Sequence, residues 1–400
     1  MVLKLLLLLN FLFLTTLNSR IKEIFHIKET KFLLSNNDAK NESQYLNQVN
    51  AMPVTLERWK NKLFLVTPRF KQNIPATLSY LDITNLKTMG NYTPIFIPYP
   101  NQNVHDISSH NLTSVVIVRA DVCDRLWILD SGKINNNREI ASSIHIYDLR
   151  TDTHLRTFSL ESLSNTNSDF SNIIIDVTSS TCEDAYAYVP DSDTYRLIVY
   201  RWKTNDSNAI SHNYFHFDPI YGDFNFGSVH YQSQKGLYGI SLSPVERDSY
   251  RTVYFHSIAS TMGFTVSSKI LQDWKYDQNK DVYEFKVMGS RGMNKQAKSS
   301  TLDMETGVLF YGLVLKNIIG CWNSYSGEEY NEHTQSNIIL DNDQDLFPSD
   351  VRVDKTGNLW VLSNTLPIYI NNNFDQSYIN TKIYMTPVRQ IIKGTVCDEM

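Results

Sequence analysis

His212 and His216 are four residues apart, a spacing that lets two imidazoles bind one zinc ion when it falls on a helix. The residues that follow His212 read NYFHFD (213–218), and such an aromatic-rich run is more typical of a strand than of a helix. We therefore expect both histidines to lie on the surface or in the core, and we predict no metal site here.

Acidic residues offer a second chemistry, calcium binding. The run DNDQD (341–345) resembles the start of a calcium loop, but Leu346 replaces the glycine and Arg352 the glutamate that such a loop needs. Asp176 and Asp350 lie in apolar runs, where a carboxylate either holds an ion or accepts hydrogen bonds from backbone N–H groups. The second interpretation is favoured, so the sequence predicts no metal and no cofactor.

Several familiar catalytic signatures are missing. The sequence contains no G-x-S-x-G, H-E-x-x-H, G-x-G-x-x-G or P-loop pattern. Enzymes that depend on a nucleophile elbow, a zincin helix or a phosphate-binding glycine loop are therefore excluded. The sequence favours a protein that is not an enzyme.

The chain has four cysteines, Cys123, Cys182, Cys321 and Cys397. None are spaced as C-x-x-C, which argues against a zinc site. Four cysteines allow three disulfide connectivities, and in an oxidising compartment we expect two bridges. Because only three residues follow Cys397, its bridge would hold the C-terminal tail in place.

The N-terminus has the pattern of a secretory signal peptide. Lys4 precedes an apolar run at 5–14 that only Asn10 interrupts, which is long enough for a signal core and too short to span a bilayer. We predict a signal peptide at 1–19 and one mature domain at 20–400. The protein is therefore expected to be secreted and extracellular, with no membrane partner.

Four N-glycosylation sequons agree with this expectation. They begin at Asn41, Asn91, Asn111 and Asn205, and none has proline at its second position. We expect some of these asparagines to carry glycans on the surface.

Composition limits the partners and the fold. The chain has 400 residues, with 37 lysines and arginines against 42 aspartates and glutamates, and we find no clustered basic run. This balance argues against binding to nucleic acid, which needs a basic surface. The 6 Trp, 23 Tyr and 19 Phe favour β-structure.

A repeated pattern indicates which elements must position any site. Apolar runs centred on an aromatic residue recur every 50 to 66 residues, at Phe64, Trp127, Tyr188, Tyr254, Phe310 and Trp360. A polar turn and a second apolar run precede most of them, which is a hairpin signal. Six such units predict an all-β, six-bladed β-propeller with a central channel. Two β-sandwiches are the rival fold, but no flexible linker divides the chain. The sequence also allows one short helix, within 52–59.

The assembled motifs resemble the yellow and major royal jelly protein family of insects. The resemblance covers nearly the whole mature chain and rests on PIFIPYP (94–100), CDRLWILDSG (123–132), YGISLSP (238–244), GVLFYGLV (307–314), GCWN (320–323), FPSD (347–350) and LWVLSN (359–364). It implies a six-bladed propeller, in agreement with the repeat count. It also implies disulfides Cys123–Cys182 and Cys321–Cys397.

The resemblance further implies a ligand site. Members of the family that bind biogenic amines in salivary secretions hold the amino group in the central channel with a threonine and an asparagine. The matching positions here are Ser349 and Asn364, and Phe347 falls at an aromatic wall position. Leu366 stands where the amine binders carry phenylalanine, so stacking on that side would be lost. The alternative is that Ser349 and Asn364 only satisfy backbone groups.

Three functions follow as hypotheses. The leading one is a secreted, non-catalytic protein that binds a small ligand, a biogenic amine or a related aromatic, in the channel. The second is a dopachrome-converting enzyme of pigmentation, which ranks lower because no acid–base pair is evident. The third is a structural or nutritional glandular protein. Assembly into a homo-oligomer stays open.

Overall fold

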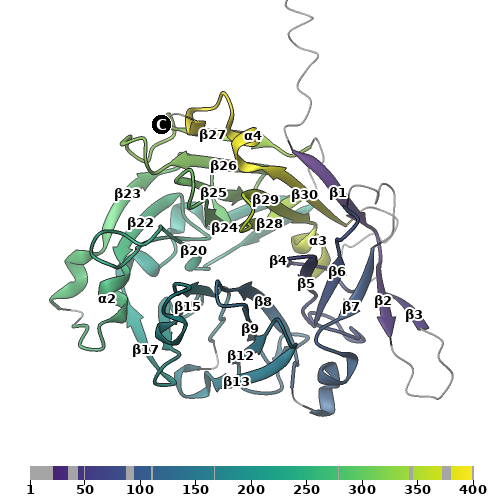
Figure 1. Cartoon of the computed structure of the whole chain (residues 1–400). Coiled ribbons are helices and arrows are strands. Elements are labelled where there is room, and N and C mark those ends of the chain that lie inside the picture. The colour runs from purple at the N-terminus through teal and green to yellow at the C-terminus, as the bar shows by residue number, and fades with distance from the viewer. Residues whose placement is uncertain are drawn as a thin grey trace, which may run out of the picture.

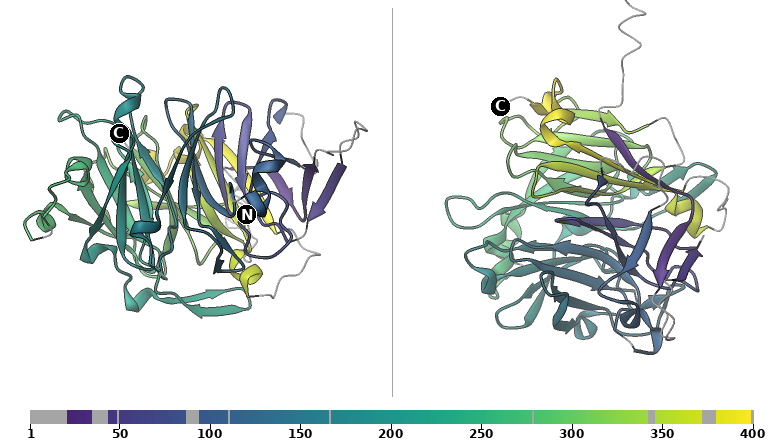
Figure 2. Two further views of the ribbon diagram at one scale, coloured as in Figure 1. Left: turned by 90° about the horizontal axis from the view of Figure 1, so that it is seen from below. Right: turned by 45° about the vertical axis from the view of Figure 1, so that its right-hand side comes forward.

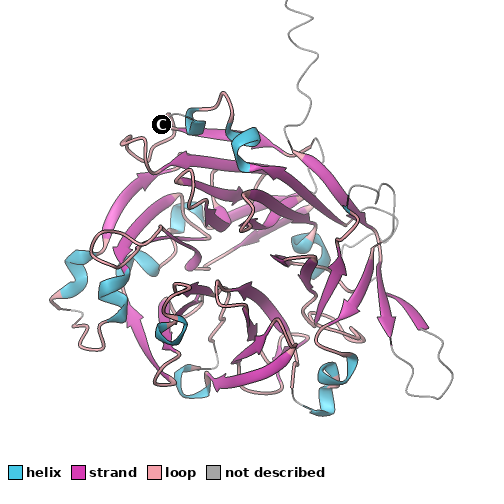
Figure 3. Ribbon diagram, viewed as in Figure 1, coloured by secondary structure: helices cyan, strands magenta, loops and turns pink. Residues whose placement is uncertain are grey.

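Short strands separated by polar turns form nearly all of the regular structure, as the recurring aromatic runs predict. The computed structural model describes residues 21–34, 44–48, 50–86, 94–109, 111–165, 167–277, 279–341, 346–371 and 380–398. In this part of the chain the helices are short and the strands fan out around a central axis (Figures 1 and 3). The predicted signal peptide at 1–19 lies outside the described residues.

The first three blades follow one another along the chain. Blade 1 contains β4 (Thr55–Trp59), β5 (Lys62–Val66), β6 (Leu78–Asp82) and β7 (Ile95–Pro98), and is widened by β2 (Thr30–Leu34) and β3 (Gln44–Gln48). Blade 2 contains β8 (Val115–Ala120), β9 (Arg125–Asp130), β12 (Ser143–Asp148) and β13 (Thr153–Ser159). Blade 3 contains β14 (Ile174–Asp176), β15 (Tyr186–Asp191), β16 (Arg196–Arg201) and β17 (Asp206–Ser211).

The last three blades complete the ring. Blade 4 contains β20 (Leu237–Leu242), β21 (Thr252–Ser257), β22 (Met262–Ser267) and β23 (Lys286–Ser290). Blade 5 contains β24 (Ala297–Leu302), β25 (Val308–Leu313), β26 (Ile318–Asn323) and β27 (Gln335–Ile339). Blade 6 contains β28 (Phe347–Val353), β29 (Asn358–Asn364) and β30 (Thr381–Pro387), and takes β1 (Lys22–Ile27) as its outer strand. This confirms the six-bladed propeller.

The remaining elements connect or cover the blades. Two small hairpins are β10 (Lys133–Ile134) with β11 (Asn137–Arg138), and β18 (Asp223–Phe226) with β19 (Val229–Gln232). The α-helices of the described residues are α2 (Ser268–Gln272), α3 (Leu366–Ile370) and α4 (Val388–Ile392). Single 3₁₀ turns occupy Gln102–His105, Ile107–Ser109, Glu161–Leu163, Cys182–Asp184, Asn213–Phe215, Pro219–Tyr221, Asp281–Glu284 and Val396–Asp398. No helix in the described ranges is both long and apolar enough to cross a bilayer.

The six repeated aromatic residues all fall on the second strand of a blade, from Phe64 in β5 to Trp360 in β29. Every residue of β9 is buried, because a blade packs against a neighbour on each face. The prediction of a helix within 52–59 is wrong. Thr55–Trp59 forms β4, since pairing with β5 satisfies its backbone and Leu56 packs into the core.

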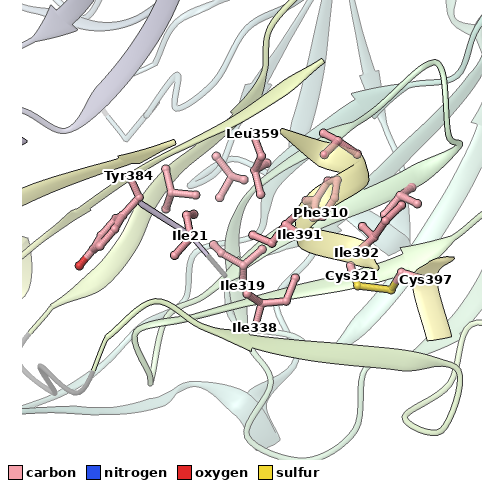
Figure 4. Close-up of a cluster of buried hydrophobic side chains, with 14 of the residues drawn as sticks. Ile21, Phe310, Ile319, Cys321, Ile338, Leu359, Tyr384, Ile391, Ile392 and Cys397 are labelled. Carbon is pink, nitrogen blue, oxygen red and sulfur yellow. A yellow bond between two sulfur atoms is a disulfide. The ribbon is translucent and has the colours of Figure 1, made fainter. Parts of the chain in front are cut away.

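The ring closes through pairing between the two ends of the chain. Strand β1 pairs antiparallel with β30, so an N-terminal segment completes the C-terminal blade. Beside it, Ile21 packs with Ile391 and Cys397 in one buried cluster (Figure 4). Burial of this apolar surface stabilises the closed ring.

Two disulfides join Cys123 with Cys182 and Cys321 with Cys397. They are the bridges that the family resemblance implies. The first links the start of blade 2's second strand to blade 3 and is half-buried, whereas both sulfurs of the second lie in the core. The second bridge ties the segment after α4 to β26.

Candidate ligand-binding site

The six innermost strands, β4, β8, β14, β20, β24 and β28, surround the central axis (Figure 1). Neighbouring innermost strands contact each other in matching order. Lys298 and then Ser299 of β24 bond to Ser349 and then Asp350 of β28. Ser349 and then Asp350 in turn bond to the Val54 carbonyl and then the Leu56 N–H. The innermost strands therefore run in one direction. Their first residues meet at one end of the channel, called the strand-start end, and their last residues meet at the strand-finish end.

Three residues suggested by the sequence come together at the strand-start end. Phe347 pairs with Asn364 across β28 and β29, and Ser349 lies two residues further along β28. Ser349 Oγ donates to the Val54 carbonyl at 2.8 Å, and Asn364 Nδ2 donates to the Pro53 carbonyl at 2.8 Å. Both side chains thus bind backbone just before β4, as the alternative interpretation expects.

Leu366 joins the same site from α3. It packs in the cluster that contains Phe347, and its backbone N–H donates to Asn364 Oδ1 at 3.1 Å. Phe347 itself is buried, with its ring edge-to-face against Phe226 at a centroid distance of 5.4 Å. The substitution of leucine for an aromatic therefore leaves an apolar contact and removes a ring.

Sequence reasoning missed the residue that dominates this end, Lys298 on β24. Its Nζ donates to Ser349 Oγ at 2.8 Å and lies 5.8 Å from the centre of the Phe347 ring and 5.6 Å from that of Tyr238. These are distances at which ring faces attract a cation. The chain therefore places an ammonium of its own beside the hydroxyl and the ring that the resemblance assigns to a ligand amine.

Burial disfavours the protonated, charged form of this lysine. It lowers the pKa of Lys298 to about 8, against the opposing attraction of Asp350 and then of Asp169. The side chain is 7% exposed. The one sequence signal for Lys298 is its position among small residues in AKSSTL (297–302), because a lysine seldom lies in a buried strand without a partner.

The β18–β19 hairpin covers the strand-start end. Phe224 and Phe226 pack with Phe347, and residues of α3 pack beside them. Figure 2 (left) shows this hairpin extending past the blades toward α3. Any ligand at this end would contact the hairpin as well as the channel wall.

A family model described as "Major royal jelly protein" matches residues 113–397. This chain belongs to the yellow and major royal jelly protein family. Among its relatives, "Protein yellow" of Drosophila melanogaster is 34% identical over 392 residues, covering 95% of this chain and 71% of the relative. "Protein yellow" of Drosophila subobscura is 37% identical over 360 residues, covering 87% of this chain and 62% of the relative.

Two solved structures resemble this family member loosely. A luciferin-regenerating enzyme aligns with a TM-score of 0.48 at 10% identity, over 84% of this chain and 92% of its own. A virginiamycin B lyase from Staphylococcus aureus aligns with a TM-score of 0.44 at 9% identity, over 92% of this chain and 98% of its own. Neither likeness carries a functional argument.

Two of the carboxylates that could have held calcium, Asp350 and Asp176, have protein partners in this family member, whereas residues 342–345 of the run 341–345 lie outside the described residues. Asp350 accepts hydrogen bonds from the Leu56 N–H at 3.1 Å and from Ser299 at 2.7 Å. Asp176 pairs with Arg251 at 2.9 Å. Among the described residues, no group of three or more His, Cys, Asp or Glu side chains could hold a metal ion.

The two histidines do not form a pair either. His212 precedes a 3₁₀ turn, where its Nδ1 accepts from the Tyr214 N–H at 3.0 Å and its ring stacks on Phe285 at 4.2 Å. His216 stacks on Tyr195 at 4.2 Å instead.

Two of the four sequon asparagines lie in the described part of the chain. Asn111 and Asn205 are exposed, and Asn205 Oδ1 accepts a hydrogen bond from the Tyr200 hydroxyl at 2.9 Å. Asn41 and Asn91 fall outside the described residues. Glycosylation of each asparagine stays a prediction.

Proposed function

We propose that this family member is a secreted, non-catalytic protein that binds a small aromatic ligand at the strand-start end of its channel. The observation that carries the proposal is the arrangement of Lys298, Ser349 and Phe347. A ring face and a hydrogen-bonding ammonium converge here beside the apolar contacts of Phe226 and Leu366, and an apolar wall with a few convergent polar groups is the usual form of a small-ligand site.

The ligand class follows from the position of Lys298, whose ammonium already lies beside the hydroxyl and the ring that would hold the amino group of a ligand. A biogenic amine and a related aromatic are the two classes that the family resemblance suggests. A second ammonium about 4 Å from Lys298 would be repelled by about 4 kcal/mol at an effective dielectric constant near 20. A phenol or catechol oxygen instead accepts a hydrogen bond from Lys298, which has three N–H donors and uses one on Ser349. We therefore favour an oxygen-bearing aromatic.

Secretion is supported by two kinds of residue. The four cysteines form two disulfides, which persist in oxidising compartments. The apolar run at 5–14 has the pattern of a signal peptide. Detection of the mature chain, beginning near residue 20, in the medium of expressing cells would test this part of the proposal.

Isothermal titration with 4-methylcatechol tests the ligand site. We expect measurable heat at protein concentrations of about 50 µM, which detects micromolar affinity. Phe347→Ala should weaken binding, because it removes the ring beneath the ligand. Tyr283→Ala is the matched control, since Tyr283 is 77% exposed and lies away from the channel. No heat from 4-methylcatechol, dopamine, serotonin or octopamine would refute the proposal.

A further inference from the structure

A pocket of about 370 Å³ lies at the strand-finish end of the channel, away from Lys298. Its volume falls within the range of about 300–1,000 Å³ that is usual for small-ligand sites. Ile174, Leu242 and Leu302 give it apolar walls from blades 3, 4 and 5. Arg119 from β8 and Arg352 from β28 line it as well. Its other charged lining residues are Arg58, Arg251 and Lys355, and the carboxylates Glu57, Asp121, Asp303, Glu305 and Asp354. Asp121, Asp354 and Glu305 already pair with Arg125, Arg58 and Arg389. The pocket thus combines hydrocarbon walls with charged groups, several of which are already paired.

The two arginines share one carboxylate oxygen at long range. Asp350 Oδ1 lies 3.5 Å from Arg119 Nη2 and 3.4 Å from Arg352 Nη2. Close charge-assisted hydrogen bonds are about 2.7–2.9 Å long. The same Asp350 oxygen already accepts a 2.7 Å hydrogen bond from Ser299. Asp350 therefore neutralises neither guanidinium fully.

Other arginines in this region are paired closely. Arg251 Nε lies 2.9 Å from Asp176, and Arg125 Nε lies 2.7 Å from Asp121. Each of these carboxylates serves one arginine among the described residues. The loose pairing is thus particular to Arg119 and Arg352.

Both of these arginines also carry an unused hydrogen-bond donor. Within the described part of the chain, Nε of Arg119 and Nε of Arg352 have no hydrogen-bond partner. Their side chains are only 7% and 9% exposed. A buried donor without a partner costs about 1–3 kcal/mol, so an acceptor that drew these guanidiniums toward it would relieve the cost.

Glu57, which also lines the pocket, does not supply the missing negative charge. Its carboxylate lies 3.8 Å from Arg119 Nη1. Burial raises the pKa of Glu57 to about 8, although Arg119 opposes the shift. At neutral pH this side chain is therefore mostly protonated, and the two guanidiniums face one shared carboxylate.

We propose that the strand-finish pocket binds a small hydrophobic carboxylic acid as its anion. The carboxylate lies against Arg119 and Arg352, whose planar guanidinium groups match its two oxygens. The hydrocarbon part packs on Ile174, Leu242 and Leu302. This site is separate from the aromatic-ligand site at the strand-start end, and it does not depend on that site.

Matched ligands test the charge requirement on the unmodified protein. Isothermal titration with 3-phenylpropionate should show binding, and 3-phenylpropan-1-ol, which has the same ring and chain length without the charge, should bind at least tenfold more weakly. Equal affinities, or binding of neither ligand, would overturn the proposal.

Substitutions then locate the site. Arg352→Gln should weaken 3-phenylpropionate binding at least tenfold, whereas Arg150→Gln, at an exposed arginine outside the pocket, should not change it. Retained affinity in folded Arg352→Gln, or an equal loss in Arg150→Gln, contradicts the assignment. If Arg352→Gln does not fold, the comparison of acid and alcohol decides the proposal alone.

Discussion

Lys298 Nζ donates a 2.8 Å hydrogen bond to Ser349 Oγ, and this contact joins β24 to β28 at one end of the channel. It places an internal cation beside the hydroxyl that family resemblance assigns to the amino group of a ligand. This chain therefore differs from an amine binder in which that hydroxyl is open to the ammonium of the ligand. We expect it to prefer ligands that accept a hydrogen bond from Lys298.

The first prediction concerns the pH dependence of amine binding. A cationic amine can take the position of Lys298 only if that lysine loses its proton, and the pKa of Lys298 is lowered to about 8. Dopamine affinity should therefore rise with pH up to about 8, by at most about tenfold per unit. Titrations at pH 6, 7 and 8 measure this, with 4-methylcatechol as the uncharged control.

The groups around Lys298 determine the pH range over which it loses its proton. Ser349 and Phe347 contact it from β28, Tyr238 faces it from β20, and Asp350 and Asp169 attract its charge. A dopamine affinity that stays constant over the three pH values would contradict the displacement of a charged lysine.

The second prediction concerns Glu57 and stability. The pKa of this carboxyl is raised from 4.5 to about 8 by burial, so between these values the folded chain binds more protons than the unfolded chain. The contribution of Glu57 to stability is therefore present below pH 4.5 and is lost as pH rises toward 8, by up to about 1.4 kcal/mol per unit.

Denaturant unfolding of the wild type and Glu57→Gln isolates this effect, because all other titrating groups are shared. The stability of the wild type relative to Glu57→Gln should fall between pH 5 and pH 8. A constant difference would mean that Glu57 is ionised in the folded protein throughout that range.

The third prediction concerns the C-terminal disulfide. Replacing Cys321 and Cys397 by serine should lower the free energy of unfolding by about 4 kcal/mol on a chain-entropy estimate. It should also free the segment after α4, since Cys397 is fully buried in the cluster that holds Ile391 (Figure 4).

Limited proteolysis with mass spectrometry measures that release. Early cleavage should appear after α4 in the Cys321→Ser, Cys397→Ser variant and not in the Cys123→Ser, Cys182→Ser variant. The same cleavage pattern in both variants would show that the bridge does not hold the tail.

Much of the fold could be predicted from the sequence, because each blade repeats one local pattern. An aromatic residue such as Trp127 or Trp360 marks the second strand of a blade, and its indole N–H donates to an aspartate six residues earlier, Asp121 or Asp354. The same local hydrogen bond thus occurs in blade 2 and in blade 6. The helix considered at 52–59 failed because pairing with β5 outweighs local preference.

The site was harder to predict because its contacts are not local. Lys298 and Ser349 are 51 residues apart, and Arg119 and Asp350 are 231 residues apart. Only closure of the ring brings β8 and β28 to the same channel. The positions Phe347, Ser349 and Asn364 came from family resemblance, and no pattern in the sequence indicated that Lys298 would lie among them.

The most direct test of the account compares 4-methylcatechol and dopamine by isothermal titration at pH 7, in the wild type and in Lys298→Ala. Lys316→Ala, at an exposed lysine, is the matched control. We predict that the wild type and the control bind 4-methylcatechol about tenfold more tightly than dopamine, because deprotonating a lysine of pKa about 8 at pH 7 costs about 1.4 kcal/mol. In Lys298→Ala the order should reverse, since Ser349 and the two rings are then open to the ammonium of the ligand. Tighter binding of dopamine by the wild type, or an unchanged order in Lys298→Ala, would contradict the account.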